Sequence, residues 1–379
     1  MAAIYFKPKG LELYHHVSFT QKSLLSPSVK ITQLFVHIIS GYERIQIDNM
    51  KAIIPVAGAG TKLRPHTYTQ PKALIPLAGK TVLSIIIDQL HEAGINDFIF
   101  IVGYLGDKIQ DYVRLKYPML NCQFVYQNER HGTGHAIDLA KEIVGTDEVF
   151  IVLGDTIAEY NVKEVIDSPV SMIGLKKVDD PRNFGVAEIN EEGLITKVVE
   201  KPAIPKSNLA LVGIYKIKET SFLFNCIKTI IEKGERNKEE YSLTDAIECM
   251  LQKGAIIKFF KVHSWFDCGK KETLLLSNST LLKKFGGSVK GLHIFENSVI
   301  IPPVSIGEGC EIHNSVIGPN VTIGEFSILN YTIVKESIIG SFSRLYDVVL
   351  DDSLIGSDTG IKGETRSLNI GDNTEIDLG

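Results

Sequence analysis

The sequence lacks the features that mark several broad classes of protein. Its five cysteines are scattered and form no CxxC pair, which excludes a disulfide scaffold and a zinc site. An odd number of isolated cysteines is typical of reduced thiols, so we expect a cytoplasmic protein. The one apolar patch near the N-terminus, Ile31 to Ile39, is too short to span a bilayer, and no membrane partner is expected.

Residues 1–49 also lack the pattern of the rest of the chain. They contain only two glycines and have no n-region, long apolar h-region or small-residue cleavage site of a secretory signal. Met50 directly precedes the first predicted core strand. We therefore interpret 1–49 as a leader outside the fold and expect translation to start at Met50, with a dispensable regulatory arm as the alternative. Mass spectrometry of the native N-terminus tests this, because a mature chain that begins well before Met50 would contradict it.

Neither disorder nor nucleic-acid binding is indicated by the composition. The 379 residues are 44% hydrophobic and 22% charged, which is ordinary for a soluble protein and long enough for two domains. Residues 291–379 hold four Lys or Arg against thirteen Asp or Glu, a net charge of −9, which leaves +4 for residues 1–290. An acidic C-terminal region repels nucleic acid, whereas the basic surplus lies where phosphates would be bound.

The stretch from Lys51 to Pro76 carries the clearest functional signal. The apolar run Ala52–Val56 predicts a buried parallel strand, which ends at the segment Gly58–Thr61. The glycines of that segment allow backbone conformations that a Cβ would forbid, and they let main-chain N–H groups approach a ligand closely. Three cations follow within eleven positions, namely Lys62, Arg64 and Lys72. The segment is therefore predicted to bind phosphate.

Two better-known phosphate motifs do not fit this stretch. The dinucleotide fingerprint G-x-G-x-x-G fails because Leu63 stands where the third glycine is required. The P-loop pattern fails because Leu74 stands at its first glycine, although Gly79-Lys80-Thr81 matches its end. From the residues alone, a tight strand-to-helix turn with solvated lysines remains the alternative.

Taken as a whole, Lys51–Pro76 resembles the signature of the sugar-1-phosphate nucleotidylyltransferases, roughly G-x-G-T-R-L-x-P-x-T-x-x-x-P-K-x-x-x-P. The resemblance implies that Lys62, Arg64 and Lys72 are catalytic. It also implies that four residues of the loop bind nucleotide: Ala57, Gly58, Gly60 and Thr61. Lys62 stands where the family has arginine. Lysine keeps the charge but loses the bidentate fork, so that role belongs to Lys62 or is shared with Arg64.

Two aspartates follow predicted strands at distant points of the chain. Asp155 comes directly after the apolar run Val149–Leu153, and Asp267 lies in the segment Trp265–Gly269. A carboxylate at the end of a buried strand suits a hard divalent cation that substrate phosphates share. An isolated Gly-Asp pair could equally be a turn or a helix N-cap. The resemblance implies that both aspartates bind Mg²⁺.

A third segment is predicted to recognise the base. Gln127 ends a predicted strand, and Gly132-Thr133-Gly134-His135 opens a helix after it. A glutamine amide can read a pyrimidine edge with its paired donor and acceptor, and the resemblance implies nucleotide binding by Gln127, Gly132 and Thr133. His135 suggests a general base, but we interpret it as structural, because nucleotidyl transfer uses a phosphate that is already anionic.

Further along the chain, several residues match the sugar-phosphate half-site of the same family. From sequence alone, Glu200-Lys201 could be an exposed pair in a turn. The match of Phe184-Gly185-Val186 fifteen residues earlier favours function. The sugar-phosphate-binding residues that the resemblance implies are Gly185, Glu200, Lys201, Asn208 and Gly213.

The chain is predicted to form a nucleotidyltransferase domain over residues 50–285, built on a Rossmann-like, doubly wound mixed sheet. Strands and helices alternate from Lys51 to Asp155, which indicates a mostly parallel sheet with ligands at the carboxyl ends of its strands. Short strands over 171–217 are expected to form an antiparallel layer that covers the crevice. Lys258–Asp267 is predicted to be one strand, and Gly134–Ile143 one helix.

After about Ser288, Ile-Gly pairs recur at spacings of 6, 11 and 16 residues, near multiples of a hexapeptide. This period predicts a parallel β-helix of about five coils. The region also resembles the extension of the long form of glucose-1-phosphate thymidylyltransferases, which implies a left-handed β-helix over residues 288–379. Because one coil cannot bury its own apolar face, we expect a homo-oligomer or docking onto a neighbouring domain.

The resemblance implies an enzyme that joins a hexose 1-phosphate to a nucleoside triphosphate and releases pyrophosphate. We rank dTTP with glucose 1-phosphate first, UTP second, and GTP with mannose 1-phosphate third. One alternative is a bifunctional uridylyltransferase and acetyltransferase with His313 as the base, although that acyltransferase domain is about twice as long in the family. Another is a non-catalytic sensor of nucleotide sugars.

Overall fold

The computed structural model describes residues 50–234, 240–291, 294–364 and 374–375, with the backbone alone described at Asp267 and Ile294. The predicted leader, 1–49, lies outside the described residues, as does part of the predicted β-helix region. Within the described ranges, no helix is both long enough and apolar enough to cross a membrane.

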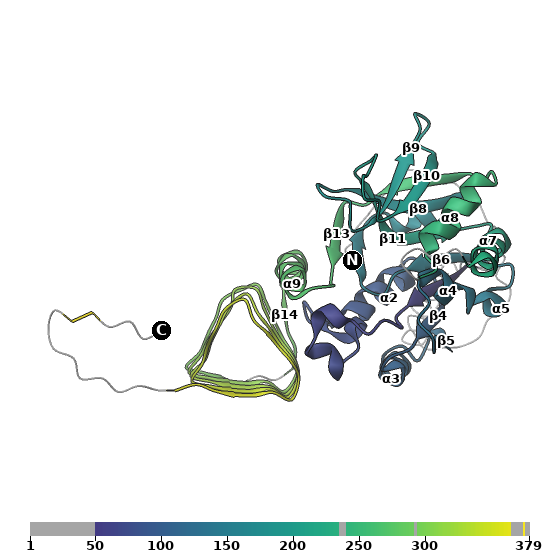
Figure 1. The fold of residues 1–379 in the computed structure, drawn as a ribbon. Helices are drawn as coiled ribbons and strands as arrows, with labels where there is room; N and C mark the ends of the chain where they lie inside the picture. Colours follow the sequence, from purple (N-terminus) through teal and green to yellow (C-terminus); the bar gives the residue numbers. More distant parts are fainter. Residues whose placement is uncertain (1–49, 235–239, 292–293, 365–373, 376–379) are drawn as a thin grey trace, which may run out of the picture. The chain divides into compact units, whose positions relative to one another are not determined.

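A nine-stranded sheet organises the N-terminal part of the described chain (Figure 1). Its central strand is β1 (Met50–Pro55), which pairs in parallel with β4 (Asp97–Val102) on one side and with β6 (Glu148–Val152) on the other. β5 (Asn121–Tyr126) extends the sheet beyond β4. The chain thus runs outward from β1 to β5 and then returns to the far side of β1. Strand order reverses between β1 and β6, and ligands bind at such reversals, beyond the carboxyl ends of the strands.

The later strands extend this same sheet with antiparallel pairs, which confirms the predicted mixed sheet; the antiparallel strands predicted over 171–217 are part of it. β11 (Leu209–Ile217) pairs antiparallel with β6, β8 and β9, which makes the sheet mixed. The predicted strand Lys258–Asp267 is in fact two strands, with Val262 and His263 between them. The first joins the sheet through β8, and the second pairs with β7. The bounds are β7 (Thr156–Glu159), β8 (Ser171–Lys177), β9 (Gly185–Ile189), β10 (Ile195–Glu200), β12 (Ile257–Lys261) and β13 (Ser264–Asp267).

Helices cover both faces of the sheet, because its parallel strands are apolar at nearly every position. In β1, Ala52 and Ile54 pack into one core and Ile53 into the other. The first core contains side chains of α2 (Val82–Glu92), α3 (Gly106–Lys116), α6 (Val162–Ile166) and α9 (Lys271–Phe285). The second contains side chains of α4 (Thr133–Asp138), α5 (Lys141–Val144), α7 (Thr220–Lys233) and α8 (Leu243–Gln252). The single helix predicted over Gly134–Ile143 is thus two short helices.

The C-terminal region confirms the predicted β-helix: three parallel sheets form the sides of a triangular prism, drawn from green to yellow in Figure 1. Val299 pairs with Val316, Val316 with Ile333, and Ile333 with Val349, so a coil takes 17 or 16 residues, slightly fewer than three hexapeptides. Aliphatic side chains stack inside the prism, such as Ile306, Ile323 and Ile339.

The strands of these sheets are short. The first sheet holds β14 (Ser288–Val289), β17 (Val304–Ile306), β20 (Val321–Ile323), β23 (Ile338–Ile339) and β26 (Leu354–Ile355). The second holds β15 (Ile294–Glu296), β18 (Glu311–His313), β21 (Ile328–Asn330), β24 (Arg344–Tyr346) and β27 (Gly360–Lys362). The third holds β16 (Val299–Ile300), β19 (Val316–Ile317), β22 (Ile333–Val334) and β25 (Val349–Leu350).

One buried amide joins α9 to the β-helix and to a turn that follows β1. Asn278 is 1% exposed. Its Oδ1 accepts hydrogen bonds from the Ala78 backbone N–H at 2.9 Å and from Thr322 Oγ1 at 2.7 Å, and its Nδ2 donates to the Asn320 carbonyl at 3.2 Å. Ala78 lies in the turn between β2 (Pro76–Leu77) and β3 (Lys80–Thr81). Three segments far apart in sequence therefore depend on one side chain.

We expect Asn278→Ala to lower the free energy of unfolding by about 2–4 kcal/mol, because each buried polar group left without a partner costs about 1–3 kcal/mol. Urea denaturation followed by circular dichroism measures the change. The matched control is Leu276→Ala on the same helix, where the side chain is 67% exposed. Equal stability of the two variants would contradict the assigned role of Asn278.

Candidate active site

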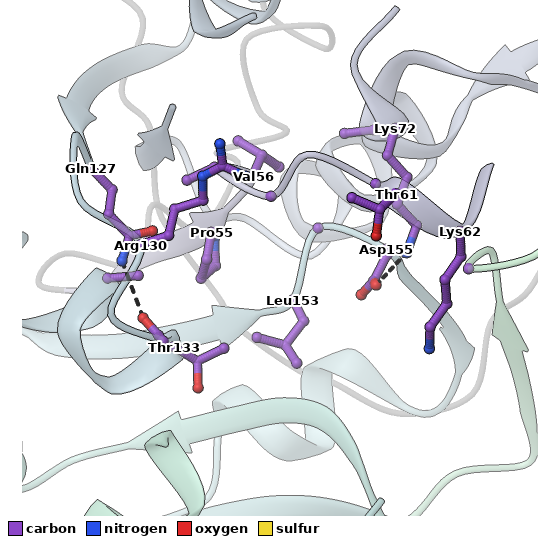
Figure 2. A pocket seen from close by; sticks show the side chains of 18 of the residues that line it. Pro55, Val56, Thr61, Lys62, Lys72, Gln127, Arg130, Thr133, Leu153 and Asp155 are labelled. Carbon is purple, nitrogen blue, oxygen red and sulfur yellow. Dashed lines mark hydrogen bonds and ion pairs between the residues drawn. The ribbon is translucent and has the colours of Figure 1, made fainter. Parts of the chain in front are cut away.

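A cavity of about 450 Å³ lies where the strand order reverses, at the carboxyl ends of β1 and β6 (Figure 2). Four parts of the chain line it. They are the loop after β1, the segment from Gln127 to Ala136, the end of β6 with Asp155, and a set of residues distant in sequence that includes Lys270. Most of the residues that the sequence predicts to bind nucleotide, metal or phosphate therefore meet in one place.

The loop after β1 is held in shape by its own glycine and threonine. Gly60 has a φ of +60°, and a Cβ there would come within 2.9 Å of Thr67 Cγ2. The Thr67 hydroxyl donates to the Gly60 carbonyl at 2.8 Å. These contacts fix the start of the 3₁₀ turn Thr61–Leu63, so that Thr61 and Lys62 line the cavity. Ala57, Gly58 and Gly60 line it as well.

The three predicted catalytic cations separate in the structure. Lys62 and Lys72 line the cavity, whereas Arg64 does not. The Arg64 guanidinium instead lies 4.9 Å from the centre of the Tyr68 ring, where a cation–π contact holds it on the exposed side of the loop. The geometry therefore favours Lys62 over Arg64 for the role of the family arginine.

Asp155 is placed by the close approach of two strand ends. The Gly154 N–H donates to the Pro55 carbonyl at 3.2 Å, and a Cβ on Gly154 would lie 2.3 Å from Val56 Cγ1. Only glycine fits there. Asp155, the next residue, projects into the cavity, where its Oδ2 accepts a hydrogen bond from Lys72 Nζ at 2.5 Å (Figure 2). The Lys72 side chain is 18% exposed and that of Asp155 42% exposed.

The backbone brings Asp267 beside Asp155. Asp267 ends β13 and pairs with Thr156, and the next residue, Cys268, donates its N–H to the Asp155 carbonyl at 3.4 Å. The Asp267 side chain lies outside the described part of the chain. The Asp155 carboxylate opens onto the cavity. Mg²⁺ keeps water ligands and needs only one or two protein carboxylates, so Asp155 fits the predicted ion.

Gln127 lies at the opposite end of the cavity from Lys62 and Asp155 (Figure 2). It is 6% exposed, and its backbone N–H donates to the Val102 carbonyl at 2.8 Å. Its Nε2 lies 3.1 Å from the Gly132 carbonyl and 3.1 Å from His135 Nδ1. The amide nitrogen is thus satisfied by protein groups, and no described residue donates to Oε1.

The glycine-rich segment after Gln127 is clamped to the start of α8. Tyr241 accepts from the Gly134 N–H at 2.8 Å and donates its own N–H to the His131 carbonyl at 2.7 Å. The Leu243 N–H donates to Thr133 Oγ1 at 3.0 Å. Gly132 has a φ of +98°, and a Cβ there would lie 2.5 Å from the Tyr241 carbonyl oxygen. Glycine is therefore required for the clamp to close.

The predicted sugar-phosphate residues do not line the cavity. Glu200 pairs with Gly185 across two strands, accepts from Thr244 Oγ1 at 2.7 Å and lies 3.2 Å from Lys201 Nζ. Gly213 adjoins the cavity only indirectly, because its carbonyl accepts from the Leu153 N–H at 2.9 Å. Asn208 lines a separate, shallow hollow with Glu188 and Lys206. Their binding role stays a prediction.

Comparison with known proteins agrees with this arrangement. A profile of the nucleotidyl transferase family matches residues 51–284. The chain belongs to the nucleotidyl transferase family. The bifunctional protein GlmU of Methanocaldococcus jannaschii is 38% identical over 261 residues, which are 69% of this chain and 61% of GlmU. A glucose-1-phosphate thymidylyltransferase of Streptomyces antibioticus is 32% identical over 72% of this chain and 77% of its own length.

Solved structures of this family share the fold. The crystal structure of a UDP-glucose pyrophosphorylase complexed with UDP-glucose superposes with a TM-score of 0.55 at 25% identity. The match covers 62% of this nucleotidyl transferase and 99% of the pyrophosphorylase. The chain spans less than two thirds of the length of the GlmU relative, so the similarity concerns only the matched part of GlmU.

Three charged lining residues of this nucleotidyl transferase were not singled out from its sequence: Arg130, Glu240 and Lys270. Arg130 carries a usable signal, because it is a cation between Gln127 and Gly132, two residues already assigned to one site. Glu240 and Lys270 carry none, since they reach the cavity only through the placement of α8 and of the segment after β13.

We expect Gly132→Ala to destabilise the protein by more than the left-handed backbone strain alone, which is on the order of 1–3 kcal/mol. The added Cβ must also displace the Tyr241 carbonyl. Gly254→Ala is the matched control, because Gly254 has a φ of +91° and open space around its missing Cβ. Thermal denaturation compares the stability of the two variants. A smaller loss of stability at Gly132 than at Gly254 would contradict this expectation, because the Tyr241 carbonyl would then move aside at little cost.

Proposed function

We propose that this protein is a sugar-1-phosphate nucleotidylyltransferase. An oxygen of the sugar 1-phosphate would attack the α-phosphorus of a nucleoside triphosphate, the bond to the β-phosphate would break, and pyrophosphate would leave with a nucleotide sugar as the other product. The supporting observation is the cavity where the glycine loop, Lys62, Lys72 and Asp155 meet at the reversal of strand order. Membership of the nucleotidyl transferase family supports it further.

In this reaction the protein must position the two substrates and neutralise their phosphate charge, whereas it does not need to supply a general base. The attacking phosphate is already anionic, so the barrier lies in bringing two highly charged groups into line. Lys62 and Lys72 place ammonium groups at the phosphate end of the cavity, and the ion pair with Asp155 holds Lys72 there. Asp155 and Asp267 would hold Mg²⁺, which would neutralise phosphate charge.

The base would lie at the other end, against Gln127. Because both amide hydrogens of Gln127 have protein acceptors, its Oε1 is the group left for a ligand. An acceptor there fits the N–H on the pairing edge of thymine, uracil or guanine and repels the ring-nitrogen acceptor of cytosine or adenine. This supports dTTP, UTP and GTP over CTP and ATP; the order dTTP, UTP, GTP, with glucose 1-phosphate as the sugar for dTTP, stays our prediction from the sequence.

The relatives support a pyrimidine but not one pyrimidine over the other. One solved structure is a complex with UDP-glucose, and one curated relative is a thymidylyltransferase. A pyrophosphate-release assay with Mg²⁺, four triphosphates and several sugar 1-phosphates tests the proposal. We expect release to be fastest with dTTP or UTP and glucose 1-phosphate. No release with any combination would overturn it and favour a nucleotide-sugar sensor.

Asp155→Asn should abolish most pyrophosphate release while leaving the fold intact. Removing a carboxylate that holds the ion costs several kcal/mol of transition-state stabilisation, so we expect a loss of at least about a hundredfold in kcat. Asp147→Asn is the control at the other end of β6, where Asp147 pairs with Lys51 at 2.7 Å outside the cavity. Activity retained by Asp155→Asn would refute the metal assignment.

A further inference from the structure

The orientation of the Gln127 amide follows from the groups around it. The Gly132 carbonyl, 3.1 Å from the amide, already accepts from the Ala136 N–H at 3.1 Å and can only accept. If the amide were reversed, two oxygens would face each other. Nε2 must therefore lie on the side of Gly132, and Oε1 on the side of the cavity.

The same nitrogen fixes the state of His135. Nε2 of Gln127 has no lone pair to accept with, so His135 Nδ1, at 3.1 Å, must be the acceptor. That requires a neutral imidazole with its proton on its own Nε2. His135 is the third residue of α4, and the clamp between Gly134 and Tyr241 holds the start of this helix. The backbone that carries the ring is therefore held in place beside Gln127.

We propose that His135 is a positioning residue for nucleotide recognition: its unprotonated Nδ1 keeps the Gln127 amide turned so that only Oε1 faces the base. This inference rests on the proposed function. His135 itself contacts no substrate in this scheme. Together with the Gly132 carbonyl, it selects bases with an N–H on their pairing edge, because both acceptors oppose the reversed orientation, in which the amide would instead donate to cytosine or adenine.

The surroundings of His135 favour the neutral ring. Burial is the main cause that lowers its pKa below the ordinary value of about 6.5, and the His131 ring, 5.3 Å away, lowers it further. Two carboxylates act in the opposite sense, Asp138 on α4 and Glu129, which is paired with His131 at 2.8 Å. On the α8 side, Glu240 lines the same cavity. The lowering groups prevail, so the ring stays neutral at pH 7.

Acid should therefore weaken nucleotide binding before it affects the chemistry. When the pH falls through the lowered pKa of His135, Nδ1 gains a proton, and two donors then face each other across the contact with Gln127. The Gly132 carbonyl still opposes the reversed amide, so the amide must withdraw from His135, and the acceptor for the base is displaced. KM for the triphosphate rises in this range, whereas kcat changes little, because His135 does not contact the reacting phosphates.

Steady-state kinetics of three variants test the inference, with dTTP, UTP and CTP as probes between about pH 5 and pH 8. For His135→Ala we expect KM for dTTP and UTP to rise roughly three- to tenfold, as one hydrogen bond to the amide is lost, and their preference over CTP to fall by a similar factor. His135→Asn can keep an acceptor near the position of Nδ1 without a titrating group. It should restore the KM and the base preference and remove the rise of KM in acid.

His131→Asn is the matched control, since this neighbouring histidine bonds Glu129 and not Gln127. It should keep the wild-type preference for dTTP and UTP over CTP. The inference is overturned if His135→Ala retains the wild-type base preference and the wild-type dependence of KM on pH, or if His131→Asn changes the preference as much as His135→Ala does.

A measurement on the unmodified protein covers the case in which the alanine variant does not fold. Nitrogen-15 NMR of labelled histidine reports the tautomer directly, and we expect the His135 proton on Nε2 at pH 7.5. A proton on Nδ1 would overturn the inference without reference to activity. Failure of the proposed function has a different signature, namely no pyrophosphate release by the wild type with any triphosphate.

Discussion

The close contact between the ends of β1 and β6 is the constraint on which the site depends. Gly154 lies against Pro55 and Val56 at distances that no Cβ allows. The two strands can therefore end side by side, and the loops that leave them open onto the same cavity. One loop supplies Lys62, and the other supplies Asp155. Cations and a carboxylate separated by some ninety residues in sequence thus become neighbours because two strands share a register.

A second contact of the same kind defines the opposite end of the cavity. The segment from His131 to Gly134 is joined to Tyr241 and Leu243 by three hydrogen bonds, two between main-chain groups and one from the Leu243 N–H to the Thr133 hydroxyl. Backbone contacts of this kind fix position without using the side chains that face the ligand. Gln127 can then be oriented by a carbonyl and an imidazole that are themselves immobile, and a rigid supporting shell is what selective recognition requires.

Much of the fold could be predicted from the sequence because buried parallel strands must be apolar at almost every position. β1 and β6 begin and end within two residues of the predicted runs Ala52–Val56 and Val149–Leu153. The strand predicted over Lys258–Asp267 is wrong because the apolar Val262 continues the pattern through a break that only the pairing of β12 with β8 and of β13 with β7 reveals. The β-helix was predictable because each coil must place an aliphatic side chain inward at a fixed spacing.

The residues of the candidate site also fall into two groups, those that a short sequence motif predicts and those that only the tertiary structure reveals. The site residues of the β1 loop could be predicted because they lie close together in the sequence and form one short motif. Most of them line the cavity. The resemblance implied a catalytic role for Arg64, and nothing in a one-letter pattern shows that Tyr68 holds it outside the cavity. Glu240 and Lys270 could not be found, because their places depend on tertiary structure.

A short, buried segment between Lys72 and Ala78 connects the β-helix to the candidate site. Lys72 lies six residues before Ala78, whose N–H is bonded to Asn278. Between them, Ala73, Leu74, Ile75 and Leu77 are all at most 5% exposed. A close-packed segment of this length transmits displacement, because its side chains have no room to absorb it. The Asn278 contact with Asn320 and Thr322 therefore fixes the turn that follows Lys72, and with it the ammonium group that pairs with Asp155.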